Sequence, residues 1–243
     1  MGRSRDDMDA KLDVVKQDMR QLIYHFSHDL RNPLVNMHAL LIDMKSMLAE
    51  AEAGRPSVLK NEMPETVKLF EQTVDRMSEM INGTNDIYHC MFDELECESV
   101  DMQELLGRVL SRFDGRLSNV DVSLNIHSNI WADPLAIAKI AEQLIDNALK
   151  SMQPDGGKLT ISVVIKNDST RFVVSDSGCG ISENDLEQLF LPFYSTRAYA
   201  PGMGLAVVKA LAESHGGRAW CESKADVGST FYTRFPKSTN KVE

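Results

Sequence analysis

The 243-residue sequence lacks any run of about eighteen apolar residues, the length that a membrane-spanning helix needs. Its first residues, Met-Gly-Arg-Ser-Arg-Asp-Asp, lead into charge rather than into the apolar stretch of a secretory signal. We therefore expect a chain that is not exported and that makes no membrane contact of its own.

Cysteine is scarce and does not have the spacing of a metal site. The four cysteines are Cys90, Cys97, Cys179 and Cys221. They form no Cys-x-x-Cys pair, so we interpret them as reduced thiols rather than as disulfides or zinc ligands. An excess of basic residues is also missing, because 36 acidic residues stand against 26 basic ones. We therefore expect no nucleic-acid partner.

Two long stretches near the N-terminus carry apolar residues at alternating spacings of three and four. They cover residues 8–48 and 67–95, and Gly54-Arg55-Pro56 interrupts them. This pattern is typical of coiled-coil helices and predicts a helical hairpin. Pro33 lies inside the first helix, where the missing backbone donor predicts a bend. Because two helices cover only one stripe of each other, we expect a homodimer in which a second copy completes a four-helix bundle.

Beyond Ser99 the pattern changes to mixed helix and strand, which marks a domain boundary. The spacing predicts helices over 102–113, 134–152 and 204–215, and strands over 120–126, 158–166, 171–175, 218–222 and 230–235. The predicted class is α+β, with a helical domain over 1–98 and a mixed domain over 99–243. The segment 96–100 between them is the expected swing point.

The first candidate motif lies on the first predicted helix. His28 is followed by Asp29 and, one helical turn later, by Asn32. A neutral imidazole is a good nucleophile near pH 7, and a neighbouring carboxylate can fix its tautomer. Taken alone, the motif also fits an ordinary exposed histidine on a helix.

A second motif lies on the helix predicted over 134–152. Gln143, Asn147 and Lys150 follow one another at spacings of four and three and so share one helical face. An amide oxygen is a suitable Mg²⁺ ligand when nucleotide phosphates complete the shell, and Lys150 would supply a counter-charge. By itself the motif also fits a solvated polar face.

Two glycine-rich motifs follow. Asp176-Ser177-Gly178-Cys179-Gly180 comes directly after a predicted strand, and Gly202-Met203-Gly204-Leu205 opens a predicted helix. Paired glycines let the backbone approach a ligand, and a helix N-terminus favours phosphate, although Gly-x-Gly alone is common in turns. The aromatic segment 189–201 between them is a candidate lid.

The order and spacing of these motifs closely resemble the catalytic core of two-component sensor histidine kinases. The segments that look like the family's H, N, G1, F and G2 boxes are His28–Pro33, the Asn147 cluster, Asp176–Gly180, Phe190–Phe193 and Gly202–Leu205, and Gly228–Phe231 resembles its closing strand. The resemblance covers nearly the whole chain. It implies a dimerisation and phosphotransfer hairpin followed by an α/β-sandwich ATP-binding domain of the Bergerat (GHKL) type.

The resemblance also implies roles for individual residues. His28 would be the phosphoacceptor, Asp29 its acid/base partner, Asn32 the residue that orients a water in dephosphorylation, Gln143 a catalytic side chain, Asn147 the Mg²⁺ ligand and Asp176 the acceptor of the adenine amino group. Lys150 and Arg197 would meet phosphates, and Gly178, Gly180, Phe193, Thr196, Gly202, Gly204, Leu205 and Thr230 would line the nucleotide.

The implied function is that of an ATP-dependent protein histidine kinase. It would phosphorylate itself on His28, pass the phosphoryl group to an aspartate of a response-regulator receiver domain, and act as that regulator's phosphatase through Asn32. The implied location is the cytoplasm, either for a whole protein or for the cytoplasmic part of a longer sensor.

Two departures from the family pattern keep an alternative open. Gln143 stands where most of these kinases have Asn, and Ala200 replaces the first glycine of the G2 box in the stiff segment Tyr199-Ala200-Pro201. The alternative is a catalytically weak scaffold that binds nucleotide and heterodimerises with other kinases. A GHKL ATPase or serine kinase that uses no histidine is a third reading, which leaves the His28 motif unexplained.

Overall fold

The computed structural model describes residues 2–166, 169–197 and 200–236, with the side chains of all of these except residues 2–25, 27 and 91. The chain divides into two compact units, one of residues 1–84 with 195–203 and the other of residues 85–194 with 204–243. Among the described helices, none combines the length and the apolarity that crossing a membrane requires.

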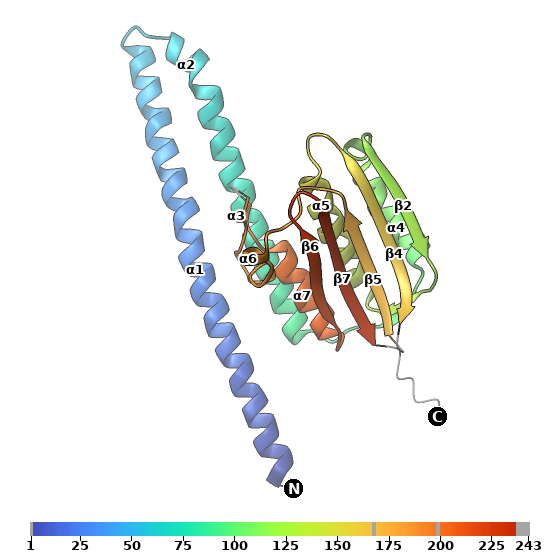
Figure 1. Ribbon diagram of the computed structural model, residues 1–243. Helices are drawn as coiled ribbons and strands as arrows, with labels where there is room; N and C mark the ends of the chain where they lie inside the picture. Colours follow the sequence, from blue (N-terminus) through green and yellow to red (C-terminus); the bar gives the residue numbers. More distant parts are fainter. Residues whose placement is uncertain (1, 167–168, 198–199, 237–243) are drawn as a thin grey trace. The chain divides into compact units, whose positions relative to one another are not determined.

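The N-terminal part is a helical hairpin, as predicted. Helix α1 (Gly2–Glu52) runs without a break through Pro33, and the short helix α2 (Ser57–Asn61) leads into α3 (Met63–Phe92). Figure 1 shows α1 and α3 as two long helices joined at one end through α2. The chain leaves α1 just before Gly54, whose φ of 98° is in the left-handed region that glycine tolerates.

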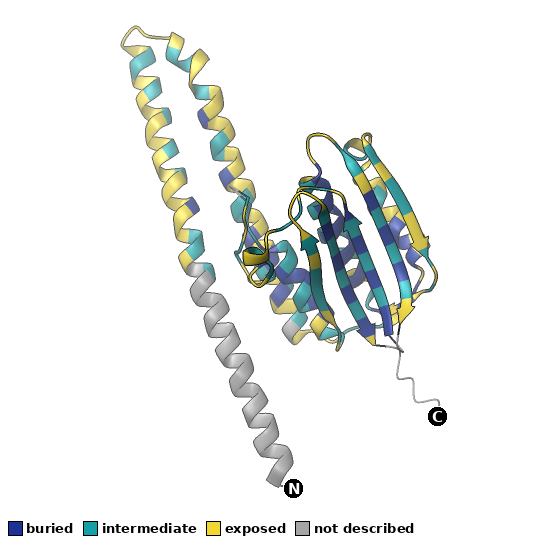
Figure 2. Ribbon diagram, viewed as in Figure 1, coloured by how far each residue is buried: buried dark blue, intermediate teal, exposed yellow. Residues whose placement is uncertain are grey.

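The predicted apolar seams divide into two rows. Alternate seam residues, among them Met37 and Met44 on α1 and Phe70 and Met77 on α3, are half-buried. The other row is exposed and recurs every seven residues, at Leu34, Leu41 and Leu48 on α1 and at Val67, Val74, Ile81 and Tyr88 on α3. Figure 2 shows this exposure along the hairpin. The early seam, from Met8 to Leu22, lies among residues whose side chains are outside the described set.

The second unit is built around a five-stranded sheet in the order β2-β4-β5-β7-β6. Its strands are β2 (Val120–Ile126), β4 (Gly157–Lys166), β5 (Ser169–Asp176), β6 (Arg218–Lys224) and β7 (Gly228–Pro236). Strands β2 and β4 are parallel and the other neighbours are antiparallel. The helical elements are α4 (Met102–Ser111), the 3₁₀ turn Asp114–Arg116, α5 (Pro134–Ser151), α6 (Glu183–Leu186) and α7 (Gly204–Ser214).

The core lies between the sheet and one layer of helices. Every second residue of the central strands is buried, as period-two patterning requires, and these side chains meet the apolar faces of α5 and α7. Figure 1 shows the helices on one face of the sheet, and the other face carries no helix of this unit. The hairpin followed by an α/β sandwich confirms the predicted fold class.

The expected swing point at 96–100 requires a correction. Residues Glu98–Val100 form strand β1, which pairs with β3 (Ile130–Ala132), and Val100 is buried. The backbone N–H of Glu96 also donates a hydrogen bond of 3.1 Å to Asp133 Oδ2. These bonds attach both ends of the segment 96–100 to the second unit, so the segment is not a free linker as expected.

Candidate functional site

His28 is displayed on the surface of α1 in the first unit. Its side chain is 61% exposed, and its Nδ1 lies 2.9 Å from Oδ1 of Asp29. An ionised carboxylate can only accept a hydrogen bond, so we infer the tautomer with the hydrogen on Nδ1 and the lone pair on Nε2. Asn32 is exposed one turn further along α1. The structure therefore brings these three predicted residues together on one stretch of helix.

On α5, the carboxylate of Asp146 forms ion pairs that the sequence analysis did not predict. Lys150 Nζ lies 2.8 Å from Asp146 Oδ2, and Arg116 Nη1 donates a hydrogen bond of 2.6 Å to Asp146 Oδ1. Partial burial raises the pKa of Asp146, but the hydrogen bonds from Lys150 and Arg116 outweigh burial and lower the pKa below its ordinary value. Asp146 therefore holds the predicted phosphate-binding lysine as part of a three-residue cluster.

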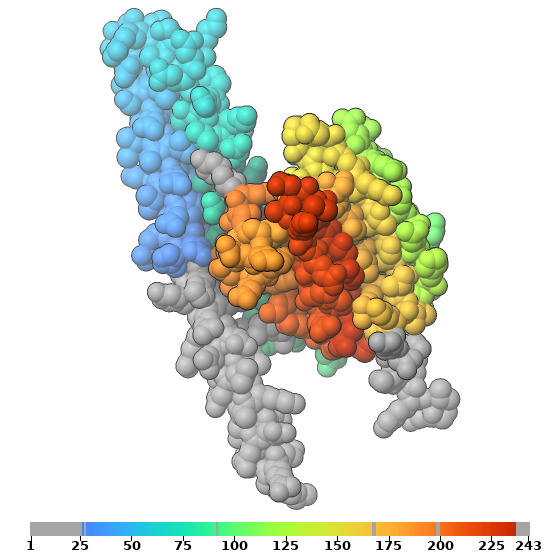
Figure 3. Space-filling view, in the orientation of Figure 1, coloured from blue at the N-terminus to red at the C-terminus, as the bar shows by residue number. Residues whose placement is uncertain are grey.

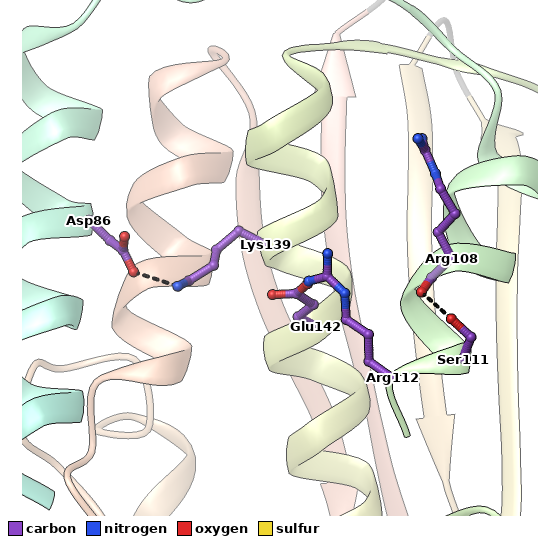
Figure 4. Close-up of polar contacts among 6 residues, drawn as sticks. All are labelled: Asp86, Arg108, Ser111, Arg112, Lys139 and Glu142. Carbon is purple, nitrogen blue, oxygen red and sulfur yellow. Dashed lines mark hydrogen bonds and ion pairs between the residues drawn. The ribbon is translucent and has the colours of Figure 1, made fainter. Parts of the chain in front are cut away.

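Ion pairs on the same helix anchor α5 to its neighbours. Lys139 Nζ lies 2.9 Å from Asp86 Oδ2 on the C-terminal part of α3, and Glu142 pairs with Arg112 next to α4. Figure 4 shows both pairs and the hydrogen bond that the Ser111 hydroxyl donates to the backbone carbonyl of Arg108. Helix α5 is thus fixed on two sides, which gives its polar face a defined position.

Asp176 ends strand β5 and is almost fully buried, with 6% of its surface exposed. Its Oδ1 accepts hydrogen bonds from Ser151 Oγ at 2.8 Å and from the backbone N–H of Gly178 at 2.9 Å. A Cβ at Gly178 would collide with Ser151, and Gly180 has a φ of 67°, so both glycines are required by the backbone. The carboxylate is thereby held in one orientation at the edge of a tight loop.

The register of β7 places Thr230 away from this carboxylate. Thr230 pairs with Ser175, and their hydroxyl oxygens are 2.9 Å apart on the face of the sheet opposite α5 and α7. Asp176 pairs instead with Ser229, which is buried. Successive strand residues point to opposite faces, so Ser229 is the hydroxyl on the Asp176 side and the sequence analysis missed it.

Gln143 and the start of α7 lie together. A Cβ at Gly204 would overlap Oε1 of Gln143, so the glutamine amide reaches the first turn of α7, where Leu205 follows. Asn147 lies one turn further along α5 and is partly exposed. Within the second unit, the structure therefore places Gln143 of the N box next to Gly204 of the G2 box.

The aromatic motif Phe190–Phe193 ends with a residue in a strained backbone conformation. Phe193 has a φ of 66°, which is unusual for a residue with a bulky side chain. The next residue, Tyr194, donates a hydrogen bond of 2.5 Å from its hydroxyl to Oδ1 of Asp185. This bond lowers the pKa of Asp185 and raises the pKa of Tyr194.

The candidate lid, residues 189–201, is divided between the two units. Its residues up to Tyr194 belong to the second unit, whereas Thr196 and Arg197 belong to the first, as does Gly202 just after the lid, so the nucleotide contacts of these three residues stay predictions. Met203 is buried, and a Cβ at Gly83 of α3 would lie 2.6 Å from its Cβ. Tyr199, part of the stiff segment noted in the sequence, lies outside the described residues.

Comparisons with known proteins agree with this geometry. Residues 132–239 match the family "Histidine kinase-, DNA gyrase B-, and HSP90-like ATPase". The signal transduction histidine-protein kinase/phosphatase MprB of Mycobacterium sp. (strain KMS) is 27% identical over 91% of this chain and 44% of that protein. The sensor histidine kinase ZraS of Escherichia coli (strain K12) is 26% identical over 98% of this chain and 50% of that protein.

A solved structure supports the fold. Histidine kinase ThkA in complex with the response regulator protein TrrA matches with a TM-score of 0.69 and 23% identity, over 91% of this chain and 62% of that chain. At this identity the likeness concerns the fold alone. The chain spans half or less of the length of the two curated relatives.

Proposed function

Because this chain has the catalytic core of a two-component sensor histidine kinase, we propose that it transfers the γ-phosphoryl group of ATP to His28 and then to an aspartate of a response regulator. The observation that carries the proposal is an exposed imidazole whose Nδ1 is bonded to Asp29, on a chain that also contains an ATPase domain.

The chemistry of the first step follows from the tautomer of His28. With its proton on Nδ1, the imidazole attacks the γ-phosphorus through the Nε2 lone pair, an N–P bond forms, and the bond from phosphorus to the bridging oxygen breaks to release ADP. Asp29 keeps the hydrogen bond to Nδ1–H and stabilises the positive charge that develops on the ring. No proton has to leave the attacking nitrogen.

The adenine end of the nucleotide would be read by Asp176. Its carboxylate is fixed by Ser151 and Gly178, so it can accept a hydrogen bond from the adenine amino group in a defined direction. We assign Ser229 to this side of the sheet in place of Thr230. The glycines on either side of Cys179 leave room for the base to approach the backbone.

The phosphate end would lie between α5 and the first turn of α7. Lys150 supplies a positive charge, Gln143 an amide, and the N-terminus of the eleven-residue helix α7 presents free backbone N–H groups. The Asn147 side chain fits a magnesium site, since an amide oxygen is a hard ligand on this partly exposed face. When bound, Mg²⁺ would neutralise charge on the phosphates.

The exposed heptad row on α1 and α3 supports the proposed homodimer. Six large apolar side chains of the first unit, from Leu34 to Ile81, recur every seven residues within α1 and α3 on a surface that no other described part of this unit covers. A second copy packed on this row would bury it and complete a four-helix bundle.

The response-regulator partner is proposed by analogy with ThkA, which was solved in complex with TrrA. Asn32 is exposed one turn from His28 and would orient a water for dephosphorylation of that regulator. The relative MprB carries the name kinase/phosphatase, which supports a second activity of this kind.

Incubation with ATP labelled at the γ-phosphate tests the proposal. We expect an acid-labile, base-stable label on the chain, lost in His28→Ala and transferred to a receiver domain. Nucleotide binding without label would instead support the weak scaffold. Label that persists in His28→Ala would contradict the proposal.

A further inference from the structure

Three arginines form one row across the outer face of the sheet, the face opposite α5 and α7. Arg171 on β5 pairs in register with Arg234 on β7, and Arg234 pairs with Arg218 on β6. Figure 3 looks onto this face of the sheet, and no described helix of the second unit lies over it. Like charges directly opposite each other on neighbouring strands are destabilising, so the row needs a compensating interaction.

Part of the compensation comes from two aromatic side chains in the adjacent row. Trp220 stacks on Tyr232, with ring centroids 4.9 Å apart and an interplanar angle of 6°. The guanidinium carbons of Arg218 and Arg171 lie 4.6 Å and 5.3 Å from the centroid of Trp220. These contacts fix the positions of two guanidinium groups, but they do not neutralise the positive charge of the row.

No carboxylate neutralises the row within the part of the chain that the structure describes. None of the three arginines appears in an ion pair there. The Nε atoms of Arg171 and Arg234 are buried and have no hydrogen-bond partner among the described residues. Glu222, the acidic residue that β6 places on the same face, accepts a hydrogen bond of 3.1 Å from the hydroxyl of Tyr232. A chain with a net charge of −10 thus presents a concentrated positive row.

We propose that this arginine face, formed by Arg171, Arg218, Arg234, Trp220 and Tyr232, binds an acidic segment of a partner protein. Guanidinium groups match carboxylates in geometry and form charge-assisted hydrogen bonds with them. Neighbouring strands are about 4.8 Å apart, so the row suits closely spaced Asp or Glu side chains.

The geometry favours a protein over a nucleic acid. A single strand binds by stacking its bases on free aromatic faces, whereas Trp220 is already stacked on Tyr232 and approached by two guanidinium groups. The net charge of −10 also repels a long polyanion more than a short acidic segment. The proposal does not depend on the kinase reaction, because Asp176 lies on the other face of the sheet.

The test uses a fluorescein-labelled peptide of alternating Glu and Gly, with binding measured by fluorescence polarisation at low salt. The variant replaces all three arginines (Arg171→Gln, Arg218→Gln and Arg234→Gln), and the control removes the same charge from three exposed lysines of the hairpin (Lys45→Gln, Lys60→Gln and Lys68→Gln). We expect the arginine variant to bind at least about tenfold more weakly, since three exposed ion pairs are lost. The lysine control should bind within about twofold of the wild type.

Two further measurements keep the proposal falsifiable. The single variant Arg218→Gln changes an exposed side chain only, and it should weaken the peptide without altering nucleotide affinity. In a Trp131→Phe background Trp220 is the only tryptophan, and its fluorescence should change as the peptide binds. Equal peptide affinity in the arginine and lysine variants would overturn the proposal. Tighter binding of a thymidine oligonucleotide of matched charge would overturn it in favour of a nucleic acid.

Discussion

Replacing Asp146 with Asn tests whether the cluster on α5 contributes to stability. The substitution keeps the shape of the side chain and removes the charge that Arg116 and Lys150 share, at 2.6 Å and 2.8 Å. Charge-assisted hydrogen bonds contribute about 1.5–3 kcal/mol when buried. The side chains of Arg116 and Lys150 are 34% and 41% exposed, so solvent screening reduces each bond to about 1 kcal/mol.

The expected loss in the free energy of unfolding is therefore about 2 kcal/mol. For a domain of this size it corresponds to a melting temperature lower by about 4–8 °C. Thermal unfolding followed by circular dichroism measures it, with Asp121→Asn as the control because Asp121 is an exposed carboxylate on β2. The control should melt within about 1 °C of the wild type.

The pH dependence gives a second check of the same cluster. The pKa of Asp146 is lowered in the folded chain, so its contribution is fully present above the unfolded value of about 3.9. The contribution is lost as the pH falls through the lower folded pKa. The stability gap between wild type and Asp146→Asn should be constant near neutral pH and close in acid. A gap below about 0.3 kcal/mol near neutral pH, or a gap that persists unchanged in acid, would show that the Asp146 cluster does not stabilise the fold in this way.

Three further substitutions test other parts of the structure. Asp176→Asn should weaken the binding of a fluorescent ADP analogue at least about tenfold in a titration, because its one acceptor oxygen is needed by Ser151 and Gly178 and its NH2 group cannot accept from the adenine amino group. Gly83→Ala should destabilise the chain in chemical unfolding although alanine favours a helix by about 1 kcal/mol, since the new Cβ would lie 2.6 Å from the Cβ of Met203; a stabilised variant would exclude the contact. Ile81→Glu should convert a dimer into a monomer in analytical ultracentrifugation, and an unchanged mass would argue against the proposed bundle.

The features that the sequence predicts well depend on short-range periodicity. The seams of α1 and α3 repeat over many turns, and Pro134 opens α5 at the residue where the sequence predicts a helix to begin, so the sequence alone predicts these helices. The same holds for His28 and Asp29, because adjacent residues on a helix are close whatever the rest of the fold does.

The features that the sequence missed depend on pairing between distant segments. Arg116 and Asp146 are thirty residues apart and meet only because the turn after α4 packs beside α5. Ser229 and Thr230 are neighbours that the strand register assigns to opposite faces, and a one-residue error in register exchanges them. Strand β1 is three residues long, too short to show a period.

Identification of the phosphorylated atom tests the central claim most directly. The autophosphorylated chain would be digested under alkaline conditions, and the phosphohistidine isomer assigned by ³¹P nuclear magnetic resonance and peptide mass spectrometry. We expect phosphate on Nε2 of His28, since Nδ1 is hydrogen-bonded to Asp29. Phosphate on Nδ1 of His28, or on any other residue, would contradict it.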